Sequence, residues 1–216
     1  MNTAYITTSI PYVNARPHVG FALELVQADV IARWHRLCNR DTFFLTGADE
    51  NSLKNVQAAA QEGITTRELC DRNAAVFRDL TGVLNISSNR FIRTSGPDHH
   101  RGASQFWHAC RPEDIYLKRY QGLYCVGCED FYLERDLVEG RCPDHDTEPV
   151  LVEEENYFFR LSAYQQQLED LLTSGRLRIL PESRYNEALS FIRQGLQDFS
   201  ISRISERSGG WGIPVP

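Results

Sequence analysis

The stretch YITTSIPYVNARPHVGFALE, residues 5–24, decides the fold of this chain. It begins with the aromatic and β-branched residues of a short strand, passes through a proline-containing turn and enters a helical pattern near His18. The first backbone N–H groups of a helix lack partners within it, and the helix dipole adds partial positive charge there. A strand, a polar turn and a helix N-terminus therefore predict a place that can hold a phosphate group.

Two residues of this turn bear directly on nucleotide binding. His18 can add a side-chain donor at the helix N-terminus. Gly20 lacks a side chain, so a flat ring such as adenine can approach its backbone. A lone His-x-Gly also fits a helix start that binds nothing, and other segments must decide between the two interpretations.

Length and composition set the broad class. The chain has 216 residues, 42% hydrophobic and 24% charged, which is typical of a soluble globular protein of one large or two small domains. Its net charge of −6 disfavours a sequence-blind nucleic-acid coat, although a local patch could still bind RNA. No apolar run approaches the ~20 residues of a membrane span. We therefore expect a cytoplasmic protein without a membrane partner, with the scattered cysteines Cys38, Cys70 and Cys110 as small core residues.

A βαβ unit follows from the first 50 residues. A helix is predicted over residues 18–37 and a second strand over 42–46, so the two strands should be parallel with a right-handed crossover. Because the helix is apolar on two sides, we expect it to be largely buried. One side comprises Val19, Leu23, Val26, Val30, Trp34 and Leu37, and the other comprises Phe21, Leu25, Ala28 and Ala32.

The second strand ends in TGADEN, residues 46–51. Ligands of open parallel sheets bind beyond the carboxyl ends of the strands, where the Asp49 carboxylate could hold an ammonium group. The alternative is that Asp49 or Asn51 only caps the next helix.

Further elements follow in order. Helices are predicted over residues 52–61, ending at Gly63, and from a capping box at Thr65 and Glu68. The second of these should turn Leu69, Val76, Phe77 and Leu80 inward. A third strand is predicted over 90–94 and a helix from Pro97, with Phe106, Trp107 and Cys110 inward. The adjacent His99 and His100 point about 100° apart on a helix, which suits surface or first-turn residues better than a metal pair.

The chain changes character near Ile115. Short aromatic segments broken by Gly122 predict the strands of a small insertion. Two knuckles follow, Cys125-x-x-Cys128 and Cys142-x-x-His145, and four such ligands predict a closed, structural zinc site. A disulfide or a redox pair is the alternative, but a cytoplasmic chain and a histidine as fourth ligand disfavour both. Helices are then predicted from a capping box at residues 162–165 to Gly175, and over residues 183–196.

Three segments together resemble the methionyl-tRNA synthetases, which are class I aminoacyl-tRNA synthetases. They are Pro11-Tyr12-Val13-Asn14 with Pro17-His18-Val19-Gly20, TGADE at 46–50, and the paired knuckles with the downstream segment 155–160. The resemblance implies an α/β fold: the first half of the class I synthetase Rossmann-like parallel sheet, with a zinc-knuckle connective-peptide insertion. It also implies a division into residues 1–114 (first Rossmann half), 115–202 (insertion, with the knuckle at about 125–145) and 203–216 (return segment).

The implied function is that of a methionine–tRNA ligase, which activates methionine with ATP and transfers it to tRNA. The implied partners are ATP, L-methionine and tRNA(Met), with Mg²⁺ accompanying ATP and Zn²⁺ in the knuckle. By resemblance, the candidate catalytic residues are His18 and Gly20, and the ATP-binding residues are Pro17, His18, Val19 and Gly20. By the same resemblance, the methionine-binding residues are Ile10, Tyr12 and Asp49, with Asp49 contacting the amino group. The metal-binding residues are Cys125, Cys128, Cys142 and His145.

The sequence departs from the family in two ways. Phe21 stands where the signature usually has a second histidine, which would remove one phosphate-facing donor. The family's second Rossmann half, its KMSKS loop and its helical anticodon-binding domain have no counterpart in these residues. We therefore expect a fragment that is weakly active or inactive alone, with exposed apolar surface and an unpaired strand. The alternatives are a non-catalytic, zinc-containing binding module or paralogue, and an enzyme that activates an amino acid for another purpose.

Overall fold

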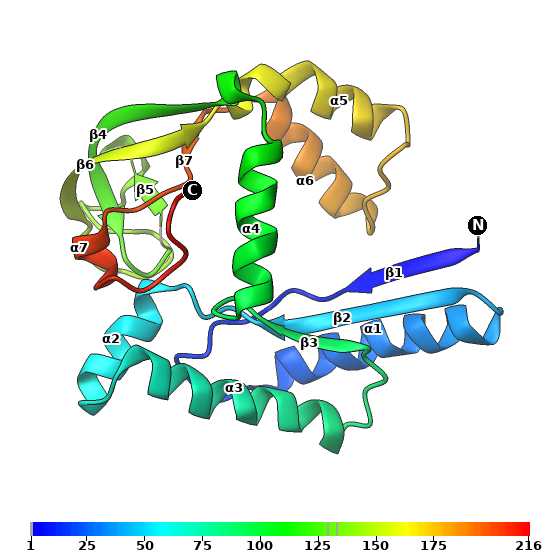
Figure 1. The fold of residues 1–216 in the computed structure, drawn as a ribbon. Helices are drawn as coiled ribbons and strands as arrows, with labels where there is room; N and C mark the ends of the chain where they lie inside the picture. Colours follow the sequence, from blue (N-terminus) through cyan, green and yellow to red (C-terminus); the bar gives the residue numbers. More distant parts are fainter. Residues whose placement is uncertain (1, 129, 133) are drawn as a thin grey trace.

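The computed structural model describes residues 2–128, 130–132 and 134–216 and contains two separate sheets (Figure 1). The first is parallel, in the order β1 (Thr3–Thr7), β2 (Asp41–Ala48) and β3 (Arg90–Arg93). Its register sets Tyr5 opposite Phe43 and Ala48 opposite Arg93. The predicted βαβ unit is confirmed, and β1 forms an edge of the sheet.

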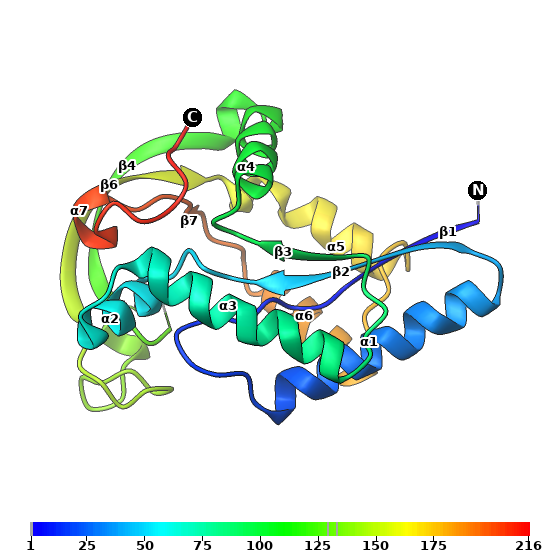
Figure 2. The ribbon, with the colours of Figure 1, turned by 60° about the horizontal axis from the view of Figure 1, so that its bottom comes forward.

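Two long helices cover one face of this sheet. They are α1 (Val19–Leu37) and α3 (Thr66–Val83), and Figure 2 shows both on the same side. This follows from the strand order, because two right-handed crossovers that step in the same direction place their helices on the same face. Ser52 caps the N-terminus of the shorter α2 (Leu53–Glu62), and the left-handed Gly63 ends it, as predicted. The capping box of Thr65 and Glu68 opens α3, also as predicted.

The core lies between these helices and the sheet. Phe44 of β2 is fully buried against α1, and Val13 of the turn after β1 is buried beneath α1 and α3. The main cluster consists of Val13, Phe21, Leu25, Ala48, Cys70, Ala74 and Phe77. Cys70 is thus a core residue as expected, whereas Cys38 is exposed and Cys110 half-buried.

The prediction that α1 is buried on two sides is wrong. Its Phe21 side is buried, but its other side faces outward, with Val19 and Leu37 each 83% exposed. On the opposite face of the sheet, the exposed rings of Tyr5 and Phe43 stack on one another. Parallel sheets are normally covered on both faces, so the expected exposed apolar surface is confirmed. Val76 of α3 is also exposed, against prediction.

Helix α4 (Pro97–Ala109) leads out of the parallel sheet, with His99 and His100 half-buried in its first turn. Phe106 is 75% exposed, so its predicted inward position is wrong. Trp107 instead packs edge-on against Tyr157 of the second sheet.

The second sheet is antiparallel, in the order β5 (Asp130–Tyr132), β4 (Ile115–Cys125), β6 (Val150–Phe159) and β7 (Phe199–Ser200). β4 runs without a break through Gly122 because β6 pairs with it from Ile115 to Tyr124, so the predicted interruption is wrong. Short 3₁₀ turns, η1 (Pro112–Asp114), η2 (Glu134–Asp136) and η3 (Leu161–Tyr164), flank these strands.

A helical pair, α5 (Gln165–Thr173) and α6 (Glu182–Arg193), packs through Leu172, Ile192 and Leu196. The predicted capping box at 162–165 is wrong, since Ser162 lies in η3 and its N–H and hydroxyl donate to Asp198. The Gln165 side chain donates to the Ile192 carbonyl and accepts from the Leu196 N–H, which fastens α5 to α6.

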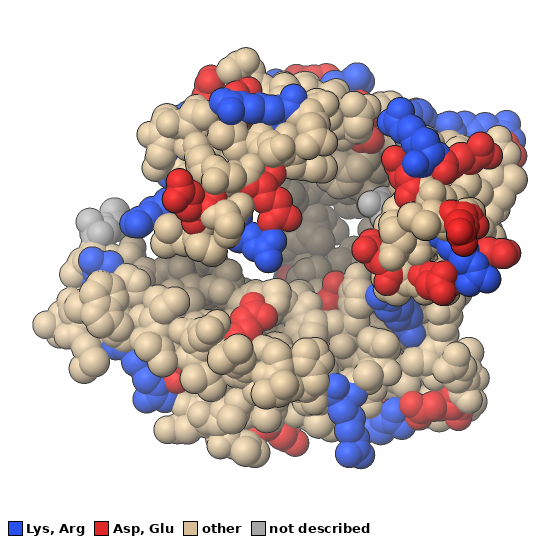
Figure 3. Space-filling view, turned by 180° about the vertical axis from the view of Figure 1, so that it is seen from behind, with Lys and Arg blue, Asp and Glu red and all other residues tan. Residues whose placement is uncertain are grey.

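The final segment returns to the parallel sheet. After β7 and the short α7 (Ser205–Ser208), Trp211 packs against the main core cluster. Figure 3 shows that the molecule is hollowed between the part built on the parallel sheet and the part built on the antiparallel sheet. A cavity of about 590 Å³ lies where this segment meets Asn51, Ser52 and Tyr124. Within the described ranges, no helix is long and apolar enough to cross a membrane.

Candidate functional site

The turn after β1 is fastened at both ends. The Thr8 hydroxyl lies 2.8 Å from that of Thr46 in β2. The Ser9 N–H and hydroxyl both donate to the Glu24 carboxylate of α1, at 2.6 Å each. Farther along, Asn73 of α3 donates to the Val13 carbonyl oxygen at 2.6 Å. The turn is therefore held at the carboxyl edge of the sheet, where parallel sheets bind ligands.

His18 is the N-cap of α1. Its backbone is extended, and its Nδ1 accepts a hydrogen bond from the Gly20 N–H at 2.9 Å. An accepting Nδ1 leaves the proton of the neutral ring on Nε2, so the exposed imidazole can donate outward from the helix N-terminus. The His18 ring thus lies at the N-terminus of α1, and its role as a phosphate donor stays a prediction.

Gly20 has a role that sequence reasoning missed. A Cβ at this position would lie only 2.6 Å from His18 Cε1, so a side chain there would displace the imidazole. The signal was available, because a side chain that caps a helix from position i lies close to residue i+2. Gly20 therefore makes room for His18, besides exposing its own backbone.

Phe21 belongs to the core. Its ring is 5% exposed and packs against Phe77, with centroids 5.3 Å apart. In this structure position 21 serves packing, and the helix N-terminus offers His18 and backbone N–H groups as donors.

Asp49 is joined to the same turn. Its N–H donates to the Pro11 carbonyl at 2.8 Å, and Tyr12 and Asp49 form an isolated parallel bridge. The Asp49 carboxylate accepts from the Asn51 N–H at 3.1 Å and from the Thr94 hydroxyl at 3.2 Å. The capping alternative is wrong, because Ser52 is the N-cap of α2 and accepts from the Lys54 N–H.

The residues expected near Asp49 are partly brought together. Tyr12 lies beside it through the backbone bridge, and the Lys54 ammonium lies 5.3 Å from the centroid of the Tyr12 ring. Ile10 and Pro17 are half-buried in the same turn, while Val19 is exposed on the first turn of α1.

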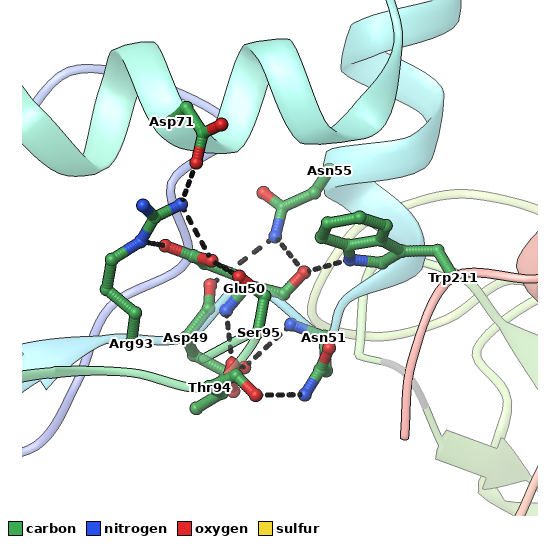
Figure 4. A network of polar contacts seen from close by, with 9 residues as sticks. All are labelled: Asp49, Glu50, Asn51, Asn55, Asp71, Arg93, Thr94, Ser95 and Trp211. Carbon is green, nitrogen blue, oxygen red and sulfur yellow. Dashed lines mark hydrogen bonds and ion pairs between the residues drawn. The ribbon is translucent and has the colours of Figure 1, made fainter. Parts of the chain in front are cut away.

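Glu50 organises a network that sequence reasoning missed (Figure 4). Its side chain is fully buried and accepts from Arg93 Nε at 2.6 Å and from the Ser95 hydroxyl, while Arg93 also donates to Asp71. Burial opposes the charge of Arg93, but the hydrogen bonds to Glu50 and Asp71 outweigh it and raise the pKa of this guanidinium. The Thr94 hydroxyl accepts from the Glu50 N–H at 2.7 Å and also donates to Asp49. The network therefore fixes the turn that carries Asp49.

The four predicted metal ligands converge beside the second sheet, at the end of β4 and in the segments that follow it. The ligand atoms of Cys125, Cys128, Cys142 and His145 all lie within 4.8 Å of one another. Cys128 Sγ lies 3.4 Å from Cys142 Sγ, well beyond the roughly 2.05 Å of a disulfide. A Cβ on Gly127 would lie 2.5 Å from the His145 ring, so the glycine makes room for this ligand.

Two thiols of this cluster have opposite pKa shifts. Burial raises the pKa of Cys142, but hydrogen bonds from the His145 ring, the Asp144 backbone N–H and the neighbouring sulfurs outweigh it and hold that pKa at about 6. Burial raises the pKa of Cys128 to about 12. Three cysteines and one histidine in a closed cluster are a donor set typical of structural zinc. The cluster fits a zinc knuckle.

A parallel sheet with a fastened polar turn and a helix N-terminus at its carboxyl edge is an arrangement typical of Rossmann-like nucleotide-binding folds. The chain belongs to the family described as tRNA synthetases class I (M), whose model matches residues 4–150 and 144–216. It is thus a member of an aminoacyl-tRNA ligase family.

Relatives and solved structures agree with this assignment. The chain is 46% identical over 217 residues to the methionine–tRNA ligase of Brucella suis biovar 1 (strain 1330), covering 98% of this chain and 42% of the relative. It is 47% identical over 214 residues to that of Thermosynechococcus vestitus, covering 98% and 40%. Its fold matches Mycobacterium tuberculosis methionyl-tRNA synthetase in complex with methionyl-adenylate, with a TM-score of 0.92, 45% identity and coverage of 100% and 43%. The chain therefore spans about two fifths of the relatives' length.

Proposed function

We propose that this chain is the part of a methionine–tRNA ligase that binds ATP and methionine at the carboxyl edge of the parallel sheet. The carrying observation is the 2.8 Å hydrogen bond from the Asp49 N–H to the Pro11 carbonyl. It joins a carboxylate suited to an ammonium group to the turn that leads into the phosphate-binding helix N-terminus. One rigid turn thus holds an amine anchor and a phosphate anchor.

Each residue has a defined part in the proposed reaction. A methionine carboxylate oxygen attacks the α-phosphorus of ATP, the bond to the bridging oxygen breaks, and pyrophosphate leaves with its Mg²⁺. His18 Nε2–H and the N-terminal N–H groups of α1 stabilise the phosphate charge. Pro17, Val19 and Gly20 shape the nucleotide site, while Asp49 holds the methionine amine and Ile10 and Tyr12 line its side chain. Catalysis rests on positioning.

The insertion has a structural part in this proposal. Cys125, Cys128, Cys142 and His145 would hold Zn²⁺, which fixes the turn between β4 and β5. All four positions are filled by protein, which leaves none for a substrate.

We also propose the division into residues 1–114, 115–202 and 203–216, a tRNA partner that accepts the methionyl group, and a cytoplasmic location.

The test is methionine-dependent exchange of labelled pyrophosphate into ATP. It compares the purified chain, His18→Ala and His108→Ala, which removes an exposed histidine of α4. We expect the isolated chain to show at most weak exchange, which requires methionine, disappears in His18→Ala and persists in His108→Ala. A folded chain with one zinc that binds neither ATP nor methionine would contradict the proposal and favour a non-catalytic binding module.

A further inference from the structure

Two polar side chains lie directly against the cysteine–histidine cluster without belonging to it. The Tyr132 hydroxyl oxygen lies 3.1 Å from Cys128 Sγ and 3.2 Å from an Asp144 carboxylate oxygen. The same carboxylate oxygen lies 3.7 Å from Cys128 Sγ. The hydroxyl therefore contacts both a metal ligand and a negatively charged carboxylate.

The backbone sets the position of Tyr132. It is the last residue of β5 and pairs with Leu123 of β4, two residues before Cys125. The preceding Phe131 anchors β5, since its ring makes edge contacts with Tyr120 and Tyr124, with centroids 4.6 and 5.0 Å away. Strand pairing thus brings the hydroxyl to Cys128.

The charge of the site with a metal bound indicates what this hydroxyl can do. Three thiolates and a neutral histidine around a divalent cation leave one net negative charge. Asp144 adds another beside Cys128, and like charges this close repel one another. A thiolate accepts hydrogen bonds, and partners around metal ligands hold them in place. The tyrosine has one hydroxyl hydrogen and two acceptors, and the sulfur, although the larger atom, is the nearer of the two.

We propose that Tyr132 is a positioning residue of the metal site: its hydroxyl donates to the Cys128 thiolate. The hydrogen bond holds Cys128 in its binding orientation and lowers its tendency to leave the metal. This inference concerns metal retention and is independent of the proposed reaction.

The first experiment measures zinc release from the purified chain to a chromophoric chelator. Tyr132→Phe removes only the hydroxyl, and we expect release about 10-fold faster, in the range for such partners. Tyr185→Phe, in the distant α6, is the matched control and should release zinc at the wild-type rate. Wild-type release from Tyr132→Phe would overturn the proposal. If Tyr132→Leu alone released zinc faster, ring packing would be responsible and the proposal would also fail.

Cobalt substitution supplies a spectroscopic readout. A hydrogen bond to a thiolate stabilises the sulfur lone pairs, so removing it should move the sulfur-to-cobalt charge-transfer band of Tyr132→Phe to longer wavelength. An unchanged band would contradict the proposed hydrogen bond.

Discussion

The indole N–H of Trp211 donates to the backbone carbonyl of Glu50 at 2.6 Å, across 161 residues of sequence. The carbonyl also accepts from the Asn55 side chain at 2.9 Å, and Arg67 lies over the indole ring at 5.2 Å. Asp49 immediately precedes Glu50, so this contact ties the last segment of the chain to the turn that carries the proposed amine anchor.

Trp211→Phe tests this tie. The variant keeps an aromatic ring but loses the donor, and we expect it to lower the free energy of unfolding by about 1 kcal/mol. Asn55 still satisfies the Glu50 carbonyl, which prevents a larger loss. Urea denaturation would measure the change. Trp34→Phe, at an exposed position of α1, is the control and should change stability by less than about 0.5 kcal/mol. Equal effects of the two substitutions would show that the hydrogen bond contributes nothing measurable.

Glu50→Gln should have a larger effect. It keeps the side-chain shape but removes the buried charge that faces Arg93. Breaking a buried pair costs about 3–5 kcal/mol, and we expect about 2–4 kcal/mol because Arg93 is 31% exposed and keeps Asp71. Glu62→Gln breaks the solvent-exposed pair with Arg72 and should lower stability far less, because water screens that pair. Urea midpoints that fall equally for both variants would contradict a structural role of the buried network.

The sequence predicted the elements whose signals are local. Ser52, Thr65 and Gly63 bound α2 and α3 through caps made within a few residues of each end, and the spacing of the two knuckles brings four metal ligands together. The sequence did not predict which side of α1 is covered. Periodicity shows which residues share a side, but what packs on each side depends on distant parts of the chain.

The Glu50 network shows the same limit within the candidate site. Arg93 follows Glu50 by 43 residues, and nothing in the sequence joins them. They become neighbours because the parallel register sets Ala48 opposite Arg93, two residues before Glu50. Asp49 could be placed at the strand end from the sequence, but its orientation by Pro11 and Thr94 could not, because it depends on that register.

The pH dependence of stability offers a third prediction, through Asp29 of α1. Burial raises the pKa of this carboxyl, but hydrogen bonds from Ser87 and Arg33 outweigh it and hold the pKa below its ordinary value of 3.8. A lowered folded pKa stabilises the protein above the unfolded value, and this contribution disappears as the pH falls from 3.8 through the folded pKa.

Asp29→Asn should therefore be less stable than the wild type near neutral pH, and the difference should shrink as the pH falls below 3.8. Urea midpoints measured at several pH values would follow the difference. Asp79→Asn, at an exposed position of α3, is the control and should show a small difference throughout. A constant difference between Asp29→Asn and the wild type across this range would mean that the carboxyl does not titrate with folding.

Gly20→Ala separates the stability of α1 from the position of the His18 imidazole at its N-terminus. Alanine in a helix is about 1 kcal/mol more favourable than glycine, yet here its Cβ would lie 2.6 Å from His18 Cε1 and displace the imidazole. We expect the free energy of unfolding to stay near that of the wild type and the Cε1–H resonance of His18 to change. Because the donor is misplaced, pyrophosphate exchange should fall by up to about 10²-fold. Gly82→Ala in α3 is the matched control: its Cβ meets no atom within 4 Å, so it should stabilise the chain and leave the His18 resonance unchanged. An unmoved His18 resonance in Gly20→Ala would show that the imidazole does not cap α1 in solution, and the donor assigned to His18 Nε2 would lose its geometric basis.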